Sequence, residues 1–270
     1  MMENITLGRY YPGSSPLHKM DPRLKIVISL LMMTAIFLVK RPIPLALLTG
    51  SVIASIVMSR IPARQILMSI RPILFVILFA FFLNIFTVDG NELIRIGPLR
   101  VTDAALETAG RMSLRLLLLI ISTSVILTLT TTPILIADAI ESLMKPLNRL
   151  RFPVHELAMM MSIALRFVPT LAEETSKIMK AQSSRGADYD TGGIIKKARG
   201  LVSVLVPLFI SAFRRAEDLA VAMEARCYHG GKGRTKLKVM HFSRLDLWAA
   251  VSFVLFLALL GILQYAANIL

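Results

Sequence analysis

Long apolar runs, separated by charged or turn-forming residues, dominate this chain. The runs cover about residues 24–39, 43–58, 72–88, 116–136 and 245–265. A helix needs about 20 mainly apolar residues to cross a bilayer, so the pattern predicts about five membrane-spanning helices. No segment shows the sustained alternation of apolar and polar residues that is typical of strands. The predicted fold is therefore an all-α polytopic membrane protein.

The pattern changes between residues 137 and 244. This stretch holds more than half of the chain's 31 Lys and Arg residues, yet it contains apolar helical segments at 155–168 and 201–213. Helices of this mixed character are typical of the membrane surface. Pro169 and Pro207 are expected to kink or break them. We therefore expect a transmembrane region at 1–136 with about four spans, a cytoplasmic module at 137–244, and a last transmembrane helix at 245–270.

Composition and charge support the membrane class. The chain is 55% hydrophobic, its mean hydropathy is +0.68, and its net charge is +14. Positive charge collects on the cytoplasmic side of membrane proteins, and this explains the excess better than nucleic-acid binding does. A single cysteine, Cys227, excludes an internal disulfide. Four scattered histidines give no metal-ligand spacing, so neither a metal nor another cofactor is expected.

Orientation follows from the basic segments. The N-terminal segment, the loop after the second run and the 137–244 module are all rich in Lys and Arg. Five spans place all three on one face, which must be cytoplasmic. The predicted location is the cell membrane, with the N-terminus and the module inside and the C-terminus outside.

Polar residues inside the runs suggest no transport pathway. Ser and Thr side chains at 122–132 either bond to carbonyls of their own helix, which we favour, or form a stripe for helix contact. We expect the Asn84 side chain to form a hydrogen bond between helices rather than to contact a ligand. The centres of the predicted spans carry no charge, which disfavours a self-contained secondary transporter. That class and a membrane enzyme are the alternatives.

No ATP site is predicted. The sequence Gly-Gly-Lys-Gly-Arg-Thr at 230–235 lacks the spacing of a phosphate-binding loop. We interpret it as a helix stop followed by a basic loop.

Two segments of the module resemble each other. Each has a proline, an acidic pair and then an arginine between small residues, namely Ser184-Arg185-Gly186 and Ala225-Arg226-Cys227. Gly186 suits the left-handed conformation that closes a helix, which would leave Arg185 projecting from a helix end. Arginine is enriched at interface hot spots. The alternative is an ordinary solvated charge that favours the helix dipole.

The chain resembles the transmembrane T component of energy-coupling-factor transporters. The resemblance rests on GRYYPGSSPLHKMDPRLK at 8–25, LRFVP at 165–169 and AMEAR at 222–226, and it covers nearly the whole chain. It implies a non-catalytic scaffold that joins two ABC-type ATPase subunits to a small substrate-binding membrane subunit. Closure of the ATPases on ATP would move coupling helices and drive uptake of a vitamin or another micronutrient.

The resemblance also implies which residues dock onto the ATPases. The family carries two Ala-Arg-Gly motifs at the ends of its coupling helices, which here correspond to Ser184, Arg185, Gly186 and to Ala225, Arg226, Cys227. Ser184 and Cys227 depart from the family pattern. Without a glycine at 227, the second helix is expected to continue until the glycines at 230 and 231 stop it.

Overall fold

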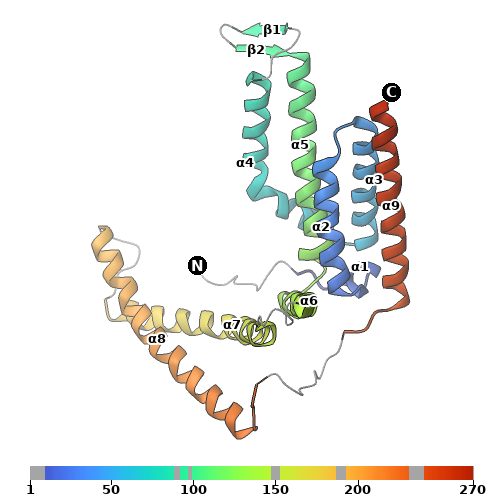
Figure 1. Cartoon of the computed structure of the whole chain (residues 1–270). Coiled ribbons are helices and arrows are strands. Elements are labelled where there is room, and N and C mark those ends of the chain that lie inside the picture. Colours follow the sequence, from blue (N-terminus) through green and yellow to red (C-terminus); the bar gives the residue numbers. More distant parts are fainter. Residues whose placement is uncertain are drawn as a thin grey trace. The chain divides into compact units, whose positions relative to one another are not determined.

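The computed structural model describes residues 10–87, 92–96, 99–146, 153–186, 193–230 and 240–269 (Figure 1). The chain divides into two compact units. We call Arg9–Ile136 together with Met240–Leu270 the membrane unit, and Ala137–Val239 the long-helix unit. Each unit is described by itself.

The membrane unit is built from helices that begin at well-defined caps. Pro22 and Pro42 occupy first helical positions, where the missing N–H of proline costs nothing. The Asp21 carboxylate accepts a hydrogen bond from the Arg23 amide at 2.8 Å, and Thr102 caps a later helix by accepting from the Ala105 amide. The elements are α1 Pro16–Lys19, α2 Pro22–Leu38, α3 Pro42–Ser59, α4 Ala63–Thr87, α5 Asp103–Thr123, the π-helical turn η1 Ser124–Thr128, and α9 Arg244–Ile269.

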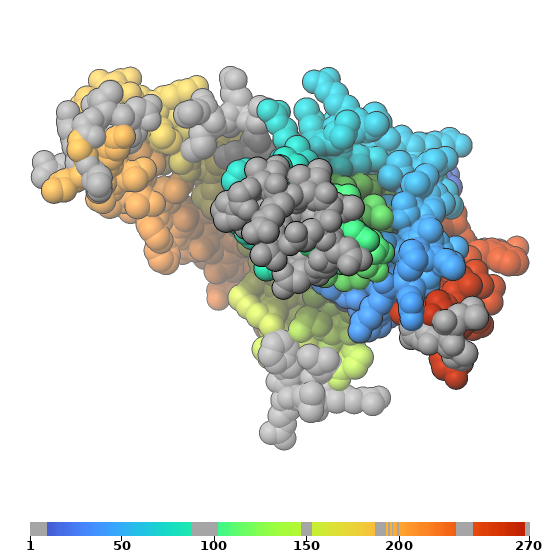
Figure 2. Space-filling view, turned by 90° about the horizontal axis from the view of Figure 1, so that it is seen from above, coloured from blue at the N-terminus to red at the C-terminus, as the bar shows by residue number. Residues whose placement is uncertain are grey.

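Two apolar clusters hold these helices together. The larger joins α2, α3, α5 and α9, and it contains Ile36, Leu48, Leu118 and Leu260. In Figure 2, cyan α4, green α5, blue α2 and α3, and red α9 follow one another across the unit. The second cluster packs Leu17 of α1 against α4 and the η1 region.

Five helices among the described residues are long and apolar enough to cross a membrane: α3, α4, α5 with η1, α7 and α9. The all-α multi-pass class is therefore confirmed. These five helices are not the five that we predicted. The predicted first span is α2, which has 17 residues, close to the shortest length that crosses a bilayer, and it is not among them. In its place stands α7 of the long-helix unit, which qualifies by length and composition.

A short hairpin connects α4 to α5. Its strands, β1 Glu92–Ile96 and β2 Leu99–Thr102, pair antiparallel, with Ile96 opposite Leu99 and an irregularity between residues 92 and 94. The sequence analysis did not anticipate it, because strands this short carry too little alternation to register as a pattern.

Two predicted spans have wrong boundaries. α4 begins at Ala63, and Pro72 lies inside it rather than at its start; the preceding residues 64–68 are mostly good helix formers that extend the helix backwards. The fourth helix begins at Asp103 instead of residue 116, because Thr102 provides a cap there. Arg115 therefore lies within α5, where its guanidinium donates to the Val39 carbonyl at 2.6 Å.

Polar side chains of the spans bond mainly within their own helices. Ser122 donates to the Leu119 carbonyl of its own helix, as we favoured, and Thr130, just after η1, donates back to the Ile126 carbonyl. The Asn84 amide also donates to its own helix, at the Ala80 carbonyl. We expected a bond between helices; the bond seen lies within α4, because a carbonyl one turn away satisfies one N–H of the amide locally.

The long-helix unit consists mainly of two helices that cross one another (Figure 1). The chain enters it within α6, Pro133–Met144, and continues through α7, Val154–Ser184, and α8, Ile194–Ala225. Pro169 and Pro207 lie inside α7 and α8 without breaking them. More than two helical turns on each side keep each helix continuous past the one hydrogen bond that its proline removes.

Candidate functional site

α7 ends at the first of the two predicted motifs. Ser184 is its last residue, Arg185 is the C-cap, and Gly186 follows in the left-handed conformation with φ of 85°. The Gly186 amide donates to the Ser183 carbonyl at 3.0 Å. The left-handed closure expected at Gly186 is thus confirmed, and it places the arginine at the point where the chain turns away from the helix.

α8 ends at the second motif in the same way. Ala225 is its last residue, Arg226 is the C-cap, and Cys227 follows with φ of 56°. The Cys227 amide donates to the Glu224 carbonyl at 2.8 Å, and the Tyr228 amide donates to the Met223 carbonyl at 3.1 Å. These two bonds form a complete Schellman closure.

The expected continuation of α8 to residues 230–231 was wrong. A left-handed conformation costs a residue other than glycine about 1–2 kcal/mol. The two hydrogen bonds of the closure satisfy carbonyls that would otherwise lack partners, and Cys227 is exposed, so its side chain meets no steric obstacle. Residues 231–235 of the glycine-lysine segment lie outside the described residues.

Both arginines are free to meet another protein. Ser184, Arg185, Gly186, Ala225, Arg226 and Cys227 are all exposed. Within the part of the chain that the structure describes, neither Arg185 nor Arg226 has an ion-pair partner. The structure thus presents two helix ends of the same geometry, each with an exposed guanidinium.

A polar contact fastens α7 to α8 where they cross. The Glu174 carboxylate of α7 accepts a hydrogen bond from the Ser211 hydroxyl and another from Arg215 of α8, the latter at 2.8 Å. The Ser211 hydrogen bond, helped by Arg215, holds the pKa of Glu174 below its usual value. Sequence analysis found the acidic pair that contains Glu174 but not its partners, which lie 37 and 41 positions away.

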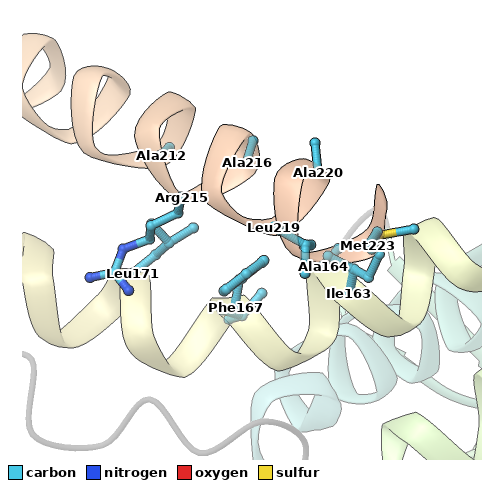
Figure 3. A pocket seen from close by; sticks show the side chains of 11 residues that line it. Ile163, Ala164, Phe167, Leu171, Ala212, Arg215, Ala216, Leu219, Ala220 and Met223 are labelled. Atoms are coloured by element: carbon cyan, nitrogen blue, oxygen red, sulfur yellow. The ribbon is translucent and has the colours of Figure 1, made fainter. Parts of the chain in front are cut away.

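An apolar groove of about 410 Å³ runs beside this contact. Figure 3 shows Arg215 of α8 beside Leu171 of α7, and Met223 of α8 beside Ile163 of α7 at the other end of the groove. Three alanines of α8, Ala212, Ala216 and Ala220, line the groove as well.

α8 also carries a broad exposed apolar surface in its middle part. We call this surface the α8 apolar face, and its members are Leu201, Val202, Leu205, Val206, Phe209, Ile210 and Phe213. The rings of Phe209 and Phe213 stack with their centroids 6.4 Å apart. A continuous apolar surface of this extent marks contact with lipid or with another protein.

Comparisons with known proteins agree on one family. The family model described as CbiQ, cobalt transport protein, matches residues 13–237. The energy-coupling factor transporter transmembrane protein EcfT of Ruminiclostridium cellulolyticum is 49% identical over 98% of this chain and 99% of its own length. The EcfT proteins of Thermosediminibacter oceani and Bacillus subtilis are 48% and 44% identical over 93% and 98% of this chain, and over 94% and 100% of their own lengths.

Proposed function

Because this chain belongs to the family of energy-coupling factor transporter transmembrane proteins, we propose that it is the coupling subunit of an uptake transporter. In this proposal it transmits ATP-driven motion from two ATPase subunits to a small substrate-binding membrane subunit. The long-helix unit is the cytoplasmic coupling module. The observation that carries the proposal is the pair of matching helix ends at Arg185 and Arg226.

Two equivalent helix ends suit two equivalent partners. Each arginine follows the last helical residue of a helix of 31 or 32 residues. A guanidinium at such a position inserts into a groove of an ATPase and donates to carboxylates or carbonyls there. Movement of the ATPases then acts on the far end of a long, continuous helix, which passes the displacement along its axis.

The substrate-binding subunit would contact the long-helix unit through its apolar surfaces. The α8 apolar face and the groove beside Glu174 offer side chains that a membrane-embedded helix can pack against. The subunit's own site would then select the vitamin or other micronutrient. ATP hydrolysis belongs to the ATPases, so this chain is a non-catalytic subunit.

The proposed topology keeps the coupling module beside the ATPases. The basic N-terminal segment and the long-helix unit lie in the cytoplasm, and the C-terminus lies outside, because basic residues concentrate in the segments assigned to the inner face.

The test is co-purification of the tagged chain from its own membranes. We expect two ABC-type ATPases and small hydrophobic proteins to accompany it. Arg185→Ala and Arg226→Ala should each weaken ATPase retention, since removing one partner of a docked charge costs about 2–5 kcal/mol. The double variant should lose the ATPases and support no uptake.

Matched controls separate docking from a general loss of charge. Lys177→Ala on α7 and Arg214→Ala on α8 remove exposed cations that lie two or more helical turns from the helix ends, and both should retain the ATPases. A double arginine variant with normal assembly and normal uptake would rule out the proposal.

A further inference from the structure

Lys25 is a buried cation that the proposed function leaves unexplained. It lies near the start of α2 and is only 1% exposed. Its ammonium donates to the Thr130 carbonyl at 3.0 Å, to the Thr130 hydroxyl at 3.2 Å and to the Thr131 hydroxyl at 3.0 Å. Three acceptors match the three N–H groups of an ammonium, so the group is fully satisfied despite its burial.

The acceptors of Lys25 lie at the exit from the membrane unit. Thr130 and Thr131 fall between the end of η1 and the start of α6 at Pro133. The division between the two units lies within α6, after Ile136. Lys25 therefore holds the last residues before the helix that carries the chain into the long-helix unit. The Tyr11 amide donates to the Leu129 carbonyl at 3.0 Å, so a second hydrogen bond fixes the residue just before Thr130.

The point of re-entry into the membrane unit is held by the same segment. The chain returns at Met240, and Asp246 in the first turn of α9 is 2% exposed. Its carboxylate accepts from the Ser243 amide and hydroxyl, and from the Asp21 amide, each at 2.8 Å. The Arg23 guanidinium lies 5.9 Å from the centre of the Phe242 ring, a distance that permits a cation–π contact.

Backbone geometry connects the two points. The Lys25 amide donates to the Asp21 carbonyl at 3.2 Å, and the Asp21 amide donates to the Asp246 carboxylate. The residue that bonds to the exit and the residue that bonds to the point of re-entry thus lie in one helical turn.

The residues just before this segment are hydrogen-bonded to one another. The Ser15 hydroxyl and His18 Nδ1 lie 2.7 Å apart, and His18 Nε2 lies 2.9 Å from the Tyr11 carbonyl. A Cβ on Gly13 would come within 2.8 Å of the His18 ring. The close approach of backbone to ring explains a glycine at that position, and it gives Asp21–Lys25 a fixed base.

We propose that Asp21–Lys25 is a shared anchor for both covalent connections between the two units, with Lys25 as its central positioning residue. Since the exit and the point of re-entry depend on one segment, a displacement of the long-helix unit reaches the membrane helices through one fixed region. The role in transmission rests on the proposed function; the anchor itself does not.

Hydrogen–deuterium exchange on the purified chain in detergent tests the anchor directly. Lys25→Met keeps most of the aliphatic stem and removes the ammonium. We expect amides in residues 126–136 and 240–248 to exchange about tenfold faster, because opening both connections becomes easier. Peptides from α3 should be unchanged. Lys19→Met is the matched control, since Lys19 is exposed on α1, and it should alter neither region.

Thr131→Val provides a milder variant if Lys25→Met fails to fold. It removes one of the three acceptors, and it should accelerate exchange in the same two regions to a smaller degree. Faster exchange at 126–136 alone would overturn the shared anchor. An equal rise throughout α3 would also overturn it, because Lys25 would then support the whole membrane unit rather than the two connections.

A second measurement addresses transmission. In the assembled transporter, Lys25→Met should retain the ATPases and their ATP hydrolysis but reduce uptake per ATP by at least about fivefold, a typical size for lost coupling. Unchanged uptake per ATP would overturn the positioning role. If the unaltered chain retains no ATPases, the proposed function fails, whereas the exchange experiment still decides whether the anchor exists.

Discussion

The membrane unit and the long-helix unit differ in how far they bury their apolar residues. The membrane unit buries a continuous cluster contributed by four helices, with Ile36 and Leu48 completely enclosed. The long helices bury few large side chains among their described residues; Val154 and Val204 are examples. They leave most of the α8 apolar face uncovered and are fastened to each other by a polar contact at Glu174.

The two units therefore contribute differently to the stability of the chain and to its assembly with other molecules. A buried cluster stabilises the unit that contains it, whereas an uncovered apolar surface lowers free energy only when a partner or lipid covers it. We infer that the membrane unit supplies the stability of the isolated chain, and that the long-helix unit depends on its partners for much of its order.

The largest effect should come from the same substitution made in both units. Leu48 is 0% exposed in the membrane unit, and Leu205 is 47% exposed on α8. Leu48→Ala should lower the free energy of unfolding by about 2–5 kcal/mol, through lost burial and the cavity left behind. Leu205→Ala should change it by less than about 0.5 kcal/mol. Thermal unfolding of the chain in detergent measures both, and equal losses would contradict the division of roles.

A smaller effect is expected at the contact between α7 and α8. Glu174→Gln weakens the acceptor for Ser211 and removes the charge facing Arg215, which should cost about 1.5 kcal/mol locally because the pair is partly exposed. Amide exchange in α7 and α8 should rise while exchange in α3 stays constant. Glu173→Gln, at an exposed neighbouring position, is the control.

The same contact should depend on pH. The pKa of Glu174 is lowered from its ordinary value of 4.5, chiefly by the Ser211 hydrogen bond. Its contribution is therefore complete above that ordinary value and is lost as the pH falls through the lowered pKa. Glu174→Gln should remove this pH dependence of exchange in α7 and α8. An unaltered pH profile in the variant would show that another group is responsible.

The smallest effect concerns the two helix ends. Cys227→Gly should stabilise the end of α8 by less than about 1 kcal/mol, because relief of the left-handed strain is offset by the greater freedom of glycine in the unfolded chain. Gly186→Ala should act in the opposite direction on α7, since φ there is 85°. Exchange of the last amides of each helix distinguishes the two, and a destabilised α8 in Cys227→Gly would contradict the proposed strain.

The sequence predicts the elements whose local pattern is long or distinctive. Apolar runs reveal the membrane helices, and Gly186 reveals a helix end, because each signal lies within the segment that it specifies. The motif positions of Arg185 and Arg226 likewise coincide with the true ends of α7 and α8. Their docking role stays a prediction.

Features that depend on long flanking segments or on distant contacts were not predicted. Prolines 72, 169 and 207 lie inside helices because long flanking segments outweigh a single lost hydrogen bond. The partners of Lys25 lie 105 and 106 positions away. A lysine near the start of an apolar run looks, from sequence, like a charge at the membrane surface, and only the fold shows that it is buried.

The π-helical turn η1 has a consequence for how the chain can change in length. A π-helical turn places one more residue in a turn than an α-helix does. Deleting one residue from Ser124–Thr128 would let this turn relax to an α-helix with the following residues in nearly the same angular position. Deleting one residue from the regular part of α5 would instead rotate the residues after it by about 100°, and Thr130 and Thr131 would then leave the Lys25 ammonium. Insertions and deletions near the β1–β2 hairpin should be tolerated across relatives, and so should loss of one residue within η1, whereas a deletion inside α5 should not.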